Sequence, residues 1–302
     1  MSAIDTAPAR ANRLYCPMLF RFAARLEQMT WSEFTSDPAD TVAALRNAQT
    51  ASGADLIVNW FDTWAECDAL GADIVRDADG NAVSCATPPR KAEPLASLKS
   101  GLLPRLKDIA ERLYAERRAG TLIAGFVTGP GTLARRVGGR SEIGSNCEGE
   151  SDAGERSAAA QLAVQWAIEL IRSYGELELD LSIIAEEEPE AKAFYRDHVK
   201  LLQPLVNLSR YYRHPLIVLN RRPQEDDLAE PSIGGAPPIG TVRMISEELF
   251  TAAAPTLTDH LKPLLVNAAS GRILMLSSWE VPIDAEPERL RELGVRLKGG
   301  DA

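Results

Sequence analysis

Three charged residues near the N-terminus have the types and spacing to bind an acidic molecule. Arg21 and Arg25 lie four residues apart in the segment MLFRFAARL, and Asp62 follows the apolar run of ADLIVNWFD. An apolar run that ends in a charged residue is typical of a buried parallel strand whose carboxyl end opens into a pocket. Because guanidinium groups bind carboxylates through two parallel hydrogen bonds, we predict a site for an anionic substrate here.

These features also have structural interpretations. An arginine at a strand end often forms an ion pair with a neighbouring helix, and Asp62 could cap a helix that begins at Thr63. The turn that starts at Gly129 could bind an anion through free backbone N–H groups, or could be an ordinary strand-to-helix turn. The residues alone leave both interpretations open.

The elements that position these residues follow from an alternation of short apolar runs with longer amphipathic segments. Runs of about five to seven residues predict strands, and apolar positions at helical spacing between them predict helices. This alternation favours a parallel sheet with helical crossovers, either closed as a barrel or open and doubly wound. The expected strands are 15–20, 55–60, 122–127, 179–185, 216–220, 240–245 and 272–277, and the expected helices are 37–51, 94–118, 153–174, 189–211, 246–269 and 287–297.

Two segments interrupt the alternation. Residues 138–156 are rich in Gly, Ser and Glu, and residues 221–238 are charged and rich in turn formers, so both predict loops. An eight-stranded barrel would normally have another helix and strand near 221–238. We therefore expect one barrel strand to be missing or distorted there.

The composition of the 302-residue chain favours one large domain with a small partner. Its 33 basic and 43 acidic residues give a net charge of −10, which argues against binding to nucleic acids or anionic membranes. No apolar run approaches the ~18 residues of a membrane span, and the N-terminus lacks the apolar segment of a secretion signal, so we expect a cytoplasmic protein. The four cysteines are widely spaced and predict neither a zinc site nor a disulfide framework.

Four segments, in this order, resemble the uroporphyrinogen decarboxylase superfamily of (β/α)8 barrels, which includes the porphyrin-pathway decarboxylase and corrinoid-linked methyltransferases. RFAARL keeps both arginines of the motif Arg-x-x-Gly-Arg-Tyr, and WFDTWAECDALG keeps an aspartate and the glycine nine residues later. GFVTGPGTLARRVGG resembles Gly-x-Pro-x-Thr-Leu, and LMLSSWEVPIDAEPERLREL resembles the C-terminal strand and turn of the methyltransferases. The matching residues are Arg21, Arg25, Asp62, Gly71, Gly129, Pro130, Thr132, Leu133, Glu280, Pro282 and Asp284.

This resemblance implies a single barrel domain over residues 1–302, with its site at the carboxyl ends of the strands. It also implies that Arg21 and Arg25 bind substrate carboxylates, and that Asp62 accepts hydrogen bonds from pyrrole N–H groups and stabilises positive charge. These three residues are the candidate catalytic residues, and no metal or organic cofactor is then required. Members of the superfamily often pair, so a homodimer is an expected assembly.

Several positions depart from the decarboxylase pattern. Arg136 takes the place of a tyrosine that positions the substrate, and Ala185 and Glu186 stand where aspartate and serine are expected. The late histidine of the decarboxylase has no counterpart, because the last strand ends in residues 277–279, Ser-Ser-Trp. Decarboxylation of uroporphyrinogen itself is therefore open to question.

The zinc site of the methyltransferases is also altered. Asn220 and Arg222 replace its His-x-Cys pair, and Ser278 or Trp279 replaces its second cysteine. Asparagine, arginine and tryptophan are poor zinc ligands, so we predict no zinc site.

The acidic run 186–188 has two interpretations. It could hold a hard cation together with Asp226 or Asp227, or it could form an acidic first helical turn before Pro189. Arg221 and its neighbour could extend an anion site at the same rim or pair with these glutamates.

Three functions remain open. The first is an enzyme that acts on a carboxylate-bearing tetrapyrrole or related organic anion. The second is a zinc-independent methyltransferase that works with a corrinoid protein, and the third is a non-catalytic binding or accessory barrel. The candidate substrate-binding residues are Arg21, Arg25, Gly129, Arg136, Glu186, Asn220, Arg222 and Trp279.

Overall fold

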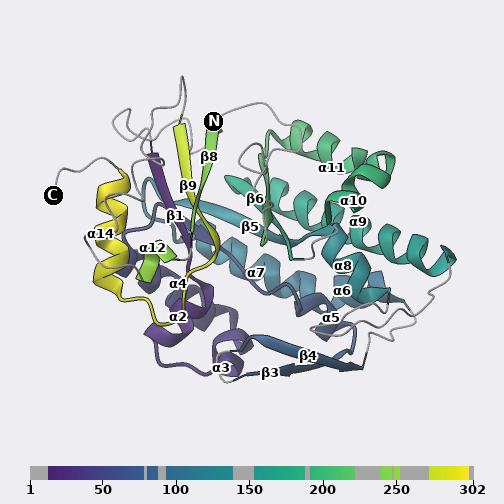
Figure 1. Ribbon diagram of the computed structural model, residues 1–302, viewed down its shortest axis with the longest axis horizontal. Helices are drawn as coiled ribbons and strands as arrows, with labels where there is room; N and C mark the ends of the chain where they lie inside the picture. The colour runs from purple at the N-terminus through teal and green to yellow at the C-terminus, as the bar shows by residue number, and fades with distance from the viewer. Residues whose placement is uncertain are drawn as a thin grey trace.

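Seven parallel strands form the centre of the molecule and share one hydrophobic core with the helices around them (Figure 1). The computed structural model describes residues 13–77, 80–87, 93–138, 153–187, 191–221, 239–246, 248–251 and 272–298. The parallel strands are β1 (Arg13–Met18), β2 (Leu56–Val58), β5 (Leu122–Thr128), β6 (Leu181–Glu186), β7 (Leu216–Asn220), β8 (Ile239–Ile245) and β9 (Arg272–Glu280).

These strands make two hydrogen-bonded sheets, in the orders β2-β5-β6-β7 and β1-β9-β8. Tyr15 and Asp55 join the sheets, because the N–H of Asp55 donates to the Tyr15 carbonyl and the N–H of Tyr15 donates to the Asp55 carboxylate, each at 2.8 Å. Within the described residues no ladder joins β7 to β8, so hydrogen bonds do not close the row of strands. The arrangement is the predicted (β/α)8 type, and most of the irregular segment predicted at 221–238 lies outside the described residues.

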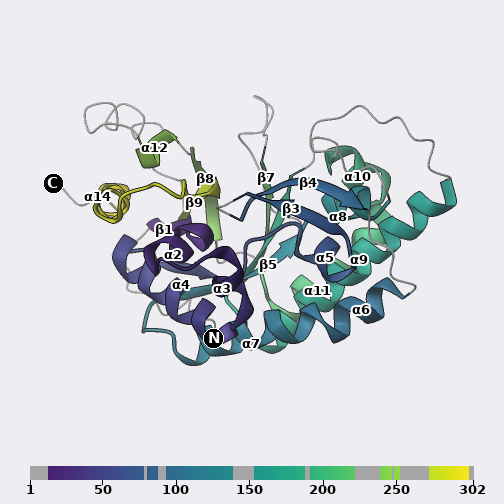
Figure 2. The same cartoon turned by 90° about the horizontal axis from the view of Figure 1, so that it is seen from below.

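The apolar runs became strands because both of their faces are covered. Every residue of β5 and β6 is buried, as expected for parallel strands with helices on one side and a filled interior on the other. Figure 2 shows the helices arranged around the strands. The helices are α2 (Phe20–Leu26), α3 (Trp31–Ser36), α4 (Pro38–Ser52), α5 (Ala65–Ala69), α6 (Pro94–Ser100), α7 (Leu102–Ala115), α8 (Pro130–Val137), α9 (Ala153–Glu176), α10 (Ala191–Asp197), α11 (Val199–Tyr212), α12 (Glu248–Thr251) and α14 (Pro287–Leu297).

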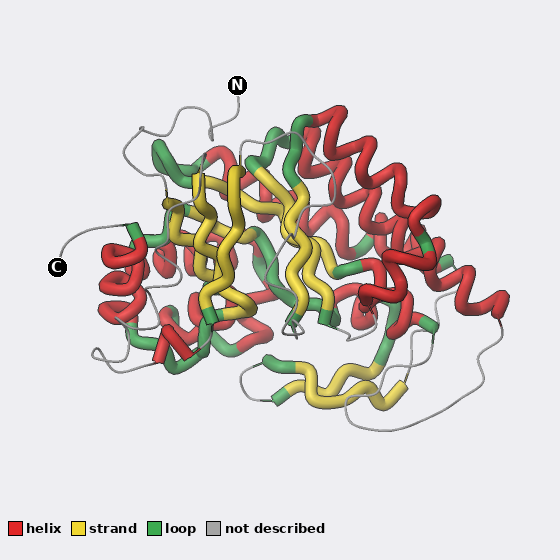
Figure 3. Tube along the Cα trace, turned by 45° about the horizontal axis from the view of Figure 1, so that its top comes forward, coloured by secondary structure: helices red, strands yellow, loops and turns green. Residues whose placement is uncertain are grey.

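One element was not predicted, the antiparallel hairpin of β3 (Asp73–Arg76) and β4 (Ala82–Thr87). It follows α5 and lies apart from the barrel strands, below the carboxyl ends of β1 and β9 in Figure 1 and at the lower edge of Figure 3. Gly71 has a φ of 85° at the turn between α5 and the hairpin, a conformation that glycine adopts without strain. Gly71, the glycine of the family-like motif, therefore allows the turn that leads from α5 into the hairpin.

Several boundaries differ from the prediction, and one of them matters for the site. The expected strand 15–20 ends at Met18, and α2 begins at Phe20, so Arg21 and Arg25 lie on a helix rather than at a strand end. The expected helix 94–118 is divided at Gly101 into α6 and α7, which places a helix start beside β2.

Candidate functional site

An ion pair between Arg21 and Glu280 joins the carboxyl ends of the first and last strands. Met18 pairs with Glu280 in the β1–β9 ladder, so the Glu280 carboxylate reaches both the backbone N–H and the guanidinium group of Arg21. Burial lowers the pKa of Arg21, but the Glu280 and Asp62 carboxylates raise it more, so its guanidinium group is charged. The guanidinium group of Arg21 is therefore bound by Glu280 in the folded protein.

Asp62 follows the carboxyl end of β2 and is 4% exposed. One carboxylate oxygen accepts a hydrogen bond from the Trp64 N–H at 3.0 Å, and the other accepts one from the Arg76 guanidinium group at 2.7 Å. Arg76 belongs to the unpredicted hairpin. Asp62 therefore orders the start of α5, which begins at Ala65 rather than at the predicted Thr63, and also forms an ion pair.

Trp31 holds the turn of the hairpin against the body of the protein. The guanidinium carbons of Arg21 and Arg76 lie 4.9 and 5.5 Å from its ring centroid, and both guanidinium groups donate to the Gly80 carbonyl, at 3.4 and 2.9 Å. Gly80 has a φ of 80°, and a Cβ atom there would lie 2.4 Å from the indole. Only glycine permits this close approach, which fixes Arg76 beside Asp62.

A cavity of about 250 Å3 opens beside this ion pair, and we call it the Trp60 cavity. Arg105, in the first turns of α7, lines it with its guanidinium carbon 5.7 Å from the Trp60 ring centroid. Burial lowers the pKa of Arg105, and the nearby Asp68 carboxylate opposes this shift. The lining residues are Trp31, Thr35, Trp60, Asp62, Ala65, Asp68, Ala69, Arg76, Gly101, Leu102 and Arg105.

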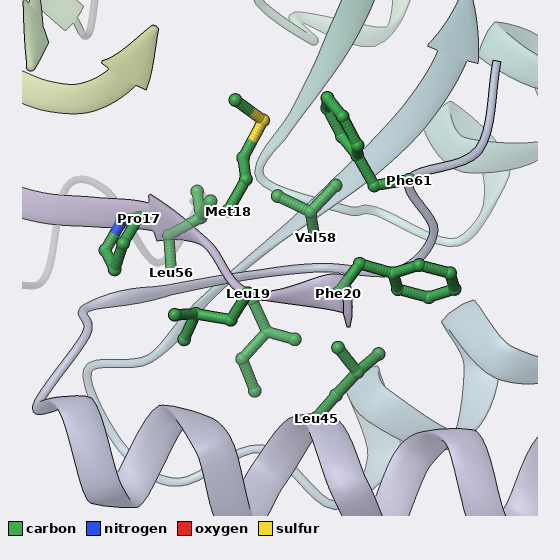
Figure 4. Close-up of a pocket in the computed structure, with 9 residues that line it drawn as sticks. Pro17, Met18, Leu19, Phe20, Leu45, Leu56, Val58 and Phe61 are labelled. Atoms are coloured by element: carbon green, nitrogen blue, oxygen red, sulfur yellow. The ribbon is translucent and has the colours of Figure 1, made fainter. Parts of the chain in front are cut away.

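A second pocket lies between β1, β2 and α4 and is shown in Figure 4. Its lining is apolar and its volume is about 10 Å3, close to the least that holds one water molecule. Pro17, Leu45 and Phe61 are among the side chains around it in Figure 4. This pocket is a gap in core packing and is too small for a substrate.

The side chain of Glu186, a predicted substrate-binding residue, occupies the turn that starts at Gly129, where the sequence allowed either an anion site or an ordinary turn. Its carboxylate accepts hydrogen bonds from the N–H groups of Gly131 and Thr132 at 3.0 and 2.7 Å, and from the Thr132 hydroxyl at 2.7 Å. A Cβ atom on Gly129 would lie 2.0 Å from the Glu186 carboxyl carbon. Of the two interpretations that the sequence left open for this turn, the backbone N–H groups at the start of α8 do bind an anion, and that anion is the Glu186 carboxylate.

Arg136 and Arg221 bind different oxygens of the Glu187 carboxylate. Arg136 is 1% exposed, also donates to the Thr63 carbonyl, and stacks on Trp64 with its guanidinium carbon 3.8 Å from the ring centroid. Burial would raise the pKa of Glu187, but the two guanidinium groups hold it below its usual value. Of the two roles that the sequence left open for Arg221, the structure shows the pairing with this acidic run, and Arg136 is a buried structural cation here.

The remaining predicted site residues do not join the Trp60 cavity. Arg25 is exposed and donates to the carbonyls of Ile283 and Ala285 at 2.6 and 3.4 Å, so the expected convergence of both motif arginines with Asp62 is corrected. Asn220 ends β7 opposite Glu186, and Trp279 contacts the Phe61 ring at 5.1 Å between centroids. Arg222 lies outside the described residues.

Sequence analysis missed Arg76, Arg105 and the buried Glu66. Glu66 accepts hydrogen bonds from the Thr128 hydroxyl at 2.8 Å and the Trp166 indole N–H at 3.0 Å, and burial raises its pKa to about 7. No motif marked these residues, because their positions depend on the hairpin, the α6–α7 break and the packing of α5. An acidic residue inside an apolar segment, as in WAECDAL, was the one available signal for Glu66.

The donor groups at the strand ends do not fit zinc. Asn220 and Trp279 are poor zinc ligands, Glu280 binds Arg21, and the Ser277 hydroxyl accepts the Met18 N–H at 2.9 Å. Among the described residues, no group of three His, Cys, Asp or Glu side chains could hold a metal ion. Glu186 and Glu187, predicted as alternative cation ligands, are bound by N–H groups and guanidinium groups, and Glu188 lies outside the described part of the chain.

The two histidines in the described residues contact neighbouring groups of the fold. His214 is buried, its imidazole nitrogens lie 2.7 Å from the Ser182 hydroxyl and 2.9 Å from the Leu179 carbonyl, and burial lowers its pKa to about 4. His198 stacks on Phe194 with 4.4 Å between ring centroids. Both histidines have structural partners.

Comparison with known proteins agrees with this architecture. The family model described as uroporphyrinogen decarboxylase (URO-D) matches residues 2–146. Among solved structures, a methyltransferase from Methanosarcina mazei superposes with a TM-score of 0.72 at 13% sequence identity, covering 98% of this chain and 96% of that chain. No curated protein matches the chain. No helix in the described part of the chain has the length and hydropathy of a membrane span.

Proposed function

We propose that this chain, a divergent relative of the uroporphyrinogen decarboxylase superfamily, is an enzyme that acts on an organic anion in the Trp60 cavity. The observation that carries the proposal is that Asp62, the acidic residue of the family-like motif, lines a cavity with two guanidinium groups. Cavities that combine apolar walls with a few convergent charged groups are the usual sites of small-molecule chemistry. The reaction that we favour is decarboxylation.

The Asp62–Arg76 pair supports a role for Asp62 as a fixed negative charge. An ionised carboxylate beside a reacting ring stabilises the positive charge that develops when a ring atom is protonated. Because Arg76 and the Trp64 N–H hold both carboxylate oxygens, Asp62 does not need to reorganise during the reaction. This arrangement suits electrostatic stabilisation better than proton transfer.

The size of the Trp60 cavity favours a small acid. Pockets for drug-sized ligands have volumes of roughly 300–1,000 Å3, and this cavity has about 250 Å3. A tetrapyrrole would have to project one acidic arm into the cavity, whereas a single-ring acid fits inside it. We therefore place the substrate among smaller organic anions related to the predicted class.

Methyl transfer is the second candidate function, because the structurally similar protein from Methanosarcina mazei is named a methyltransferase. The strand-end residues do not provide a zinc site, so such a reaction would depend on a corrinoid protein partner and on carboxylates of this chain. Retention of a corrinoid protein on the immobilised chain would support this alternative. Cytoplasmic location and a homodimer also remain predictions.

The test is a turnover assay with uroporphyrinogen, smaller pyrrole carboxylates and single-ring aromatic acids, with release of carbon dioxide as the readout. We expect Asp62→Asn to lower kcat/KM at least about 100-fold, as for other losses of preorganised charge. Asp108→Asn is the matched control, because Asp108 is exposed on α7 and pairs only with Arg112 among the described residues. Binding of these acids without product would support a non-catalytic barrel instead.

A further inference from the structure

We infer that the ligand carboxylate binds Arg105 of α7, rather than the N-terminal arginines, and that the ligand is a planar monocarboxylate held between the side chains of Trp31 and Trp60. This inference rests on the proposed function, since it concerns the same cavity. It assigns the recognition of the acid to a residue outside every family-like motif.

The other arginines at the carboxyl end of the strands already have partners in the folded protein. Arg21 binds Glu280 and Arg76 binds Asp62, while Arg25 donates to backbone carbonyls. Arg136 and Arg221 share Glu187. Each of these guanidinium groups would have to give up a partner before it could bind a ligand.

Arg105 differs from these arginines. Within the described residues it forms no ion pair or hydrogen bond, although it is partly buried, and its guanidinium group lies at the wall of the Trp60 cavity. Asp68 is near enough to oppose the effect of burial on Arg105 but does not pair with it. A ligand carboxylate would supply the charge-assisted hydrogen bonds that this guanidinium group lacks.

The walls of the cavity define the rest of the ligand. Trp31 and Trp60 are fixed by Phe20, whose ring centroid lies 5.6 and 4.9 Å from theirs. Two rigid indole rings favour a ligand that is planar and mostly apolar apart from its carboxylate. Their positions do not depend on the ligand, so little conformational entropy would be lost on binding.

The charges of the cavity favour a single carboxylate. Arg76 is already balanced by Asp62, and Asp68 adds a second negative charge near Arg105. A second ligand carboxylate would meet these acids, and the described residues that line the cavity offer it no further unpaired cation. A polycarboxylate should therefore bind more weakly than a monocarboxylate of the same ring.

The experiment measures binding of benzoate, of its neutral analogue benzamide and of benzene-1,3,5-tricarboxylate to the full chain, by calorimetry and by quenching of tryptophan fluorescence. We expect benzoate to bind at least about tenfold more tightly than the other two, and Arg105→Gln to weaken benzoate binding by about 10- to 100-fold. Arg105→Lys should restore part of the affinity. Arg112→Gln, on the exposed face of the same helix, is the control and should bind like the wild type.

The outcomes separate this inference from the proposed function. If Arg105→Gln binds benzoate like the wild type, or if Arg25→Gln weakens binding instead, the inference is wrong even when turnover of an acid is found. If benzoate binding depends on Arg105 but no acid is turned over, the inference holds and the enzymatic proposal fails. If none of the three probes binds, the assignment of the cavity to a planar acid is overturned.

Discussion

Arg76 donates to the carboxylate of Asp62 over 2.7 Å, and this contact fastens the β3–β4 hairpin to the carboxyl end of β2. The Asp62 side chain is 4% exposed and that of Arg76 is 16% exposed, so water screens the pair only weakly. Arg21 and Glu280 form a second pair beside it. Among the charged groups that line the Trp60 cavity, Arg76 and Asp62 pair with each other, whereas Arg105 and Asp68 form no ion pair in the described residues.

Removing Arg76 should destabilise the protein. Arg76→Gln leaves Asp62 buried without its cation, and we expect the free energy of unfolding to fall by about 2–4 kcal/mol. Urea denaturation measures this change. Arg46→Gln is the control, since Arg46 pairs with Glu116 at the surface and should cost at most about 0.5 kcal/mol. Equal losses for the two variants would contradict the structural role of Arg76.

Gly129→Ala should be strongly destabilising because of Glu186. The new methyl group would lie 2.0 Å from the Glu186 carboxyl carbon and would displace it from the N-terminus of α8. We expect a loss of at least about 2 kcal/mol, measured by thermal unfolding. Glu186→Ala removes the clash, so Gly129→Ala should cost far less in that background. An undiminished cost there would show that the backbone, not Glu186, excludes alanine.

Glu66 should make stability depend on pH near neutrality. Burial raises its pKa to about 7 from the usual 4.5, so the folded state binds a proton more tightly than the unfolded state. The resulting stabilisation is complete below about pH 4.5 and is lost as the pH rises through 7. For this pKa shift, the free energy of unfolding that is lost between low and high pH is roughly 3 kcal/mol.

Glu66→Gln tests this linkage, because glutamine keeps the shape of the neutral carboxyl group. The stability of the variant relative to the wild type should increase between pH 5 and pH 8, as measured by urea unfolding at each pH. Glu116→Gln, at the exposed Arg46 pair, should show no such trend. Parallel pH profiles for wild type and Glu66→Gln would contradict the assignment.

The two arginines that share Glu187 should respond differently to substitution. Arg136→Gln removes a side chain that is 1% exposed and stacked on Trp64, and we expect a loss of about 3 kcal/mol or more. Arg221 binds the same carboxylate but its side chain is exposed, so Arg221→Gln should lower the free energy of unfolding by less than about 1 kcal/mol. Chemical denaturation of both variants provides the comparison, and a reversed order would refute this account of the cluster.

A parallel sheet with helical crossovers could be predicted from local patterns, because parallel strands with two covered faces are continuous apolar runs. The choice of a barrel over an open sheet came from the resemblance at the motif residues. Runs such as 122–127 and 216–220 became β5 and β7 nearly as expected. The hairpin was missed since β3 and β4 are short, partly exposed and lack an apolar face that alternation could reveal. Arg76 and its partner were therefore not predictable.

Asp62 lies at the end of a strand beside a cavity and Gly129 lies at a strand-to-helix turn, as the local pattern indicated, while their functional roles stay predictions. The partners of the charged residues could not be predicted, because they come from far along the chain. Glu280 and Arg21 are separated by 259 residues, and Glu186 and Gly131 by 55. Sequence spacing carries no information about such partners, so it could not show that these charged groups satisfy one another.

By itself the sequence determined the alternation of strand and helix, the resemblance at the motif residues and the excess of acidic groups, because these are properties of local side-chain pattern and composition. Tertiary structure alone decided which charges remain open to a ligand. That outcome depends on ion pairs whose energy comes from burial and from contacts between distant segments. The packing of the other charged groups leaves Arg105, which lies over the Trp60 ring, without an ion-pair or hydrogen-bond partner among the described residues.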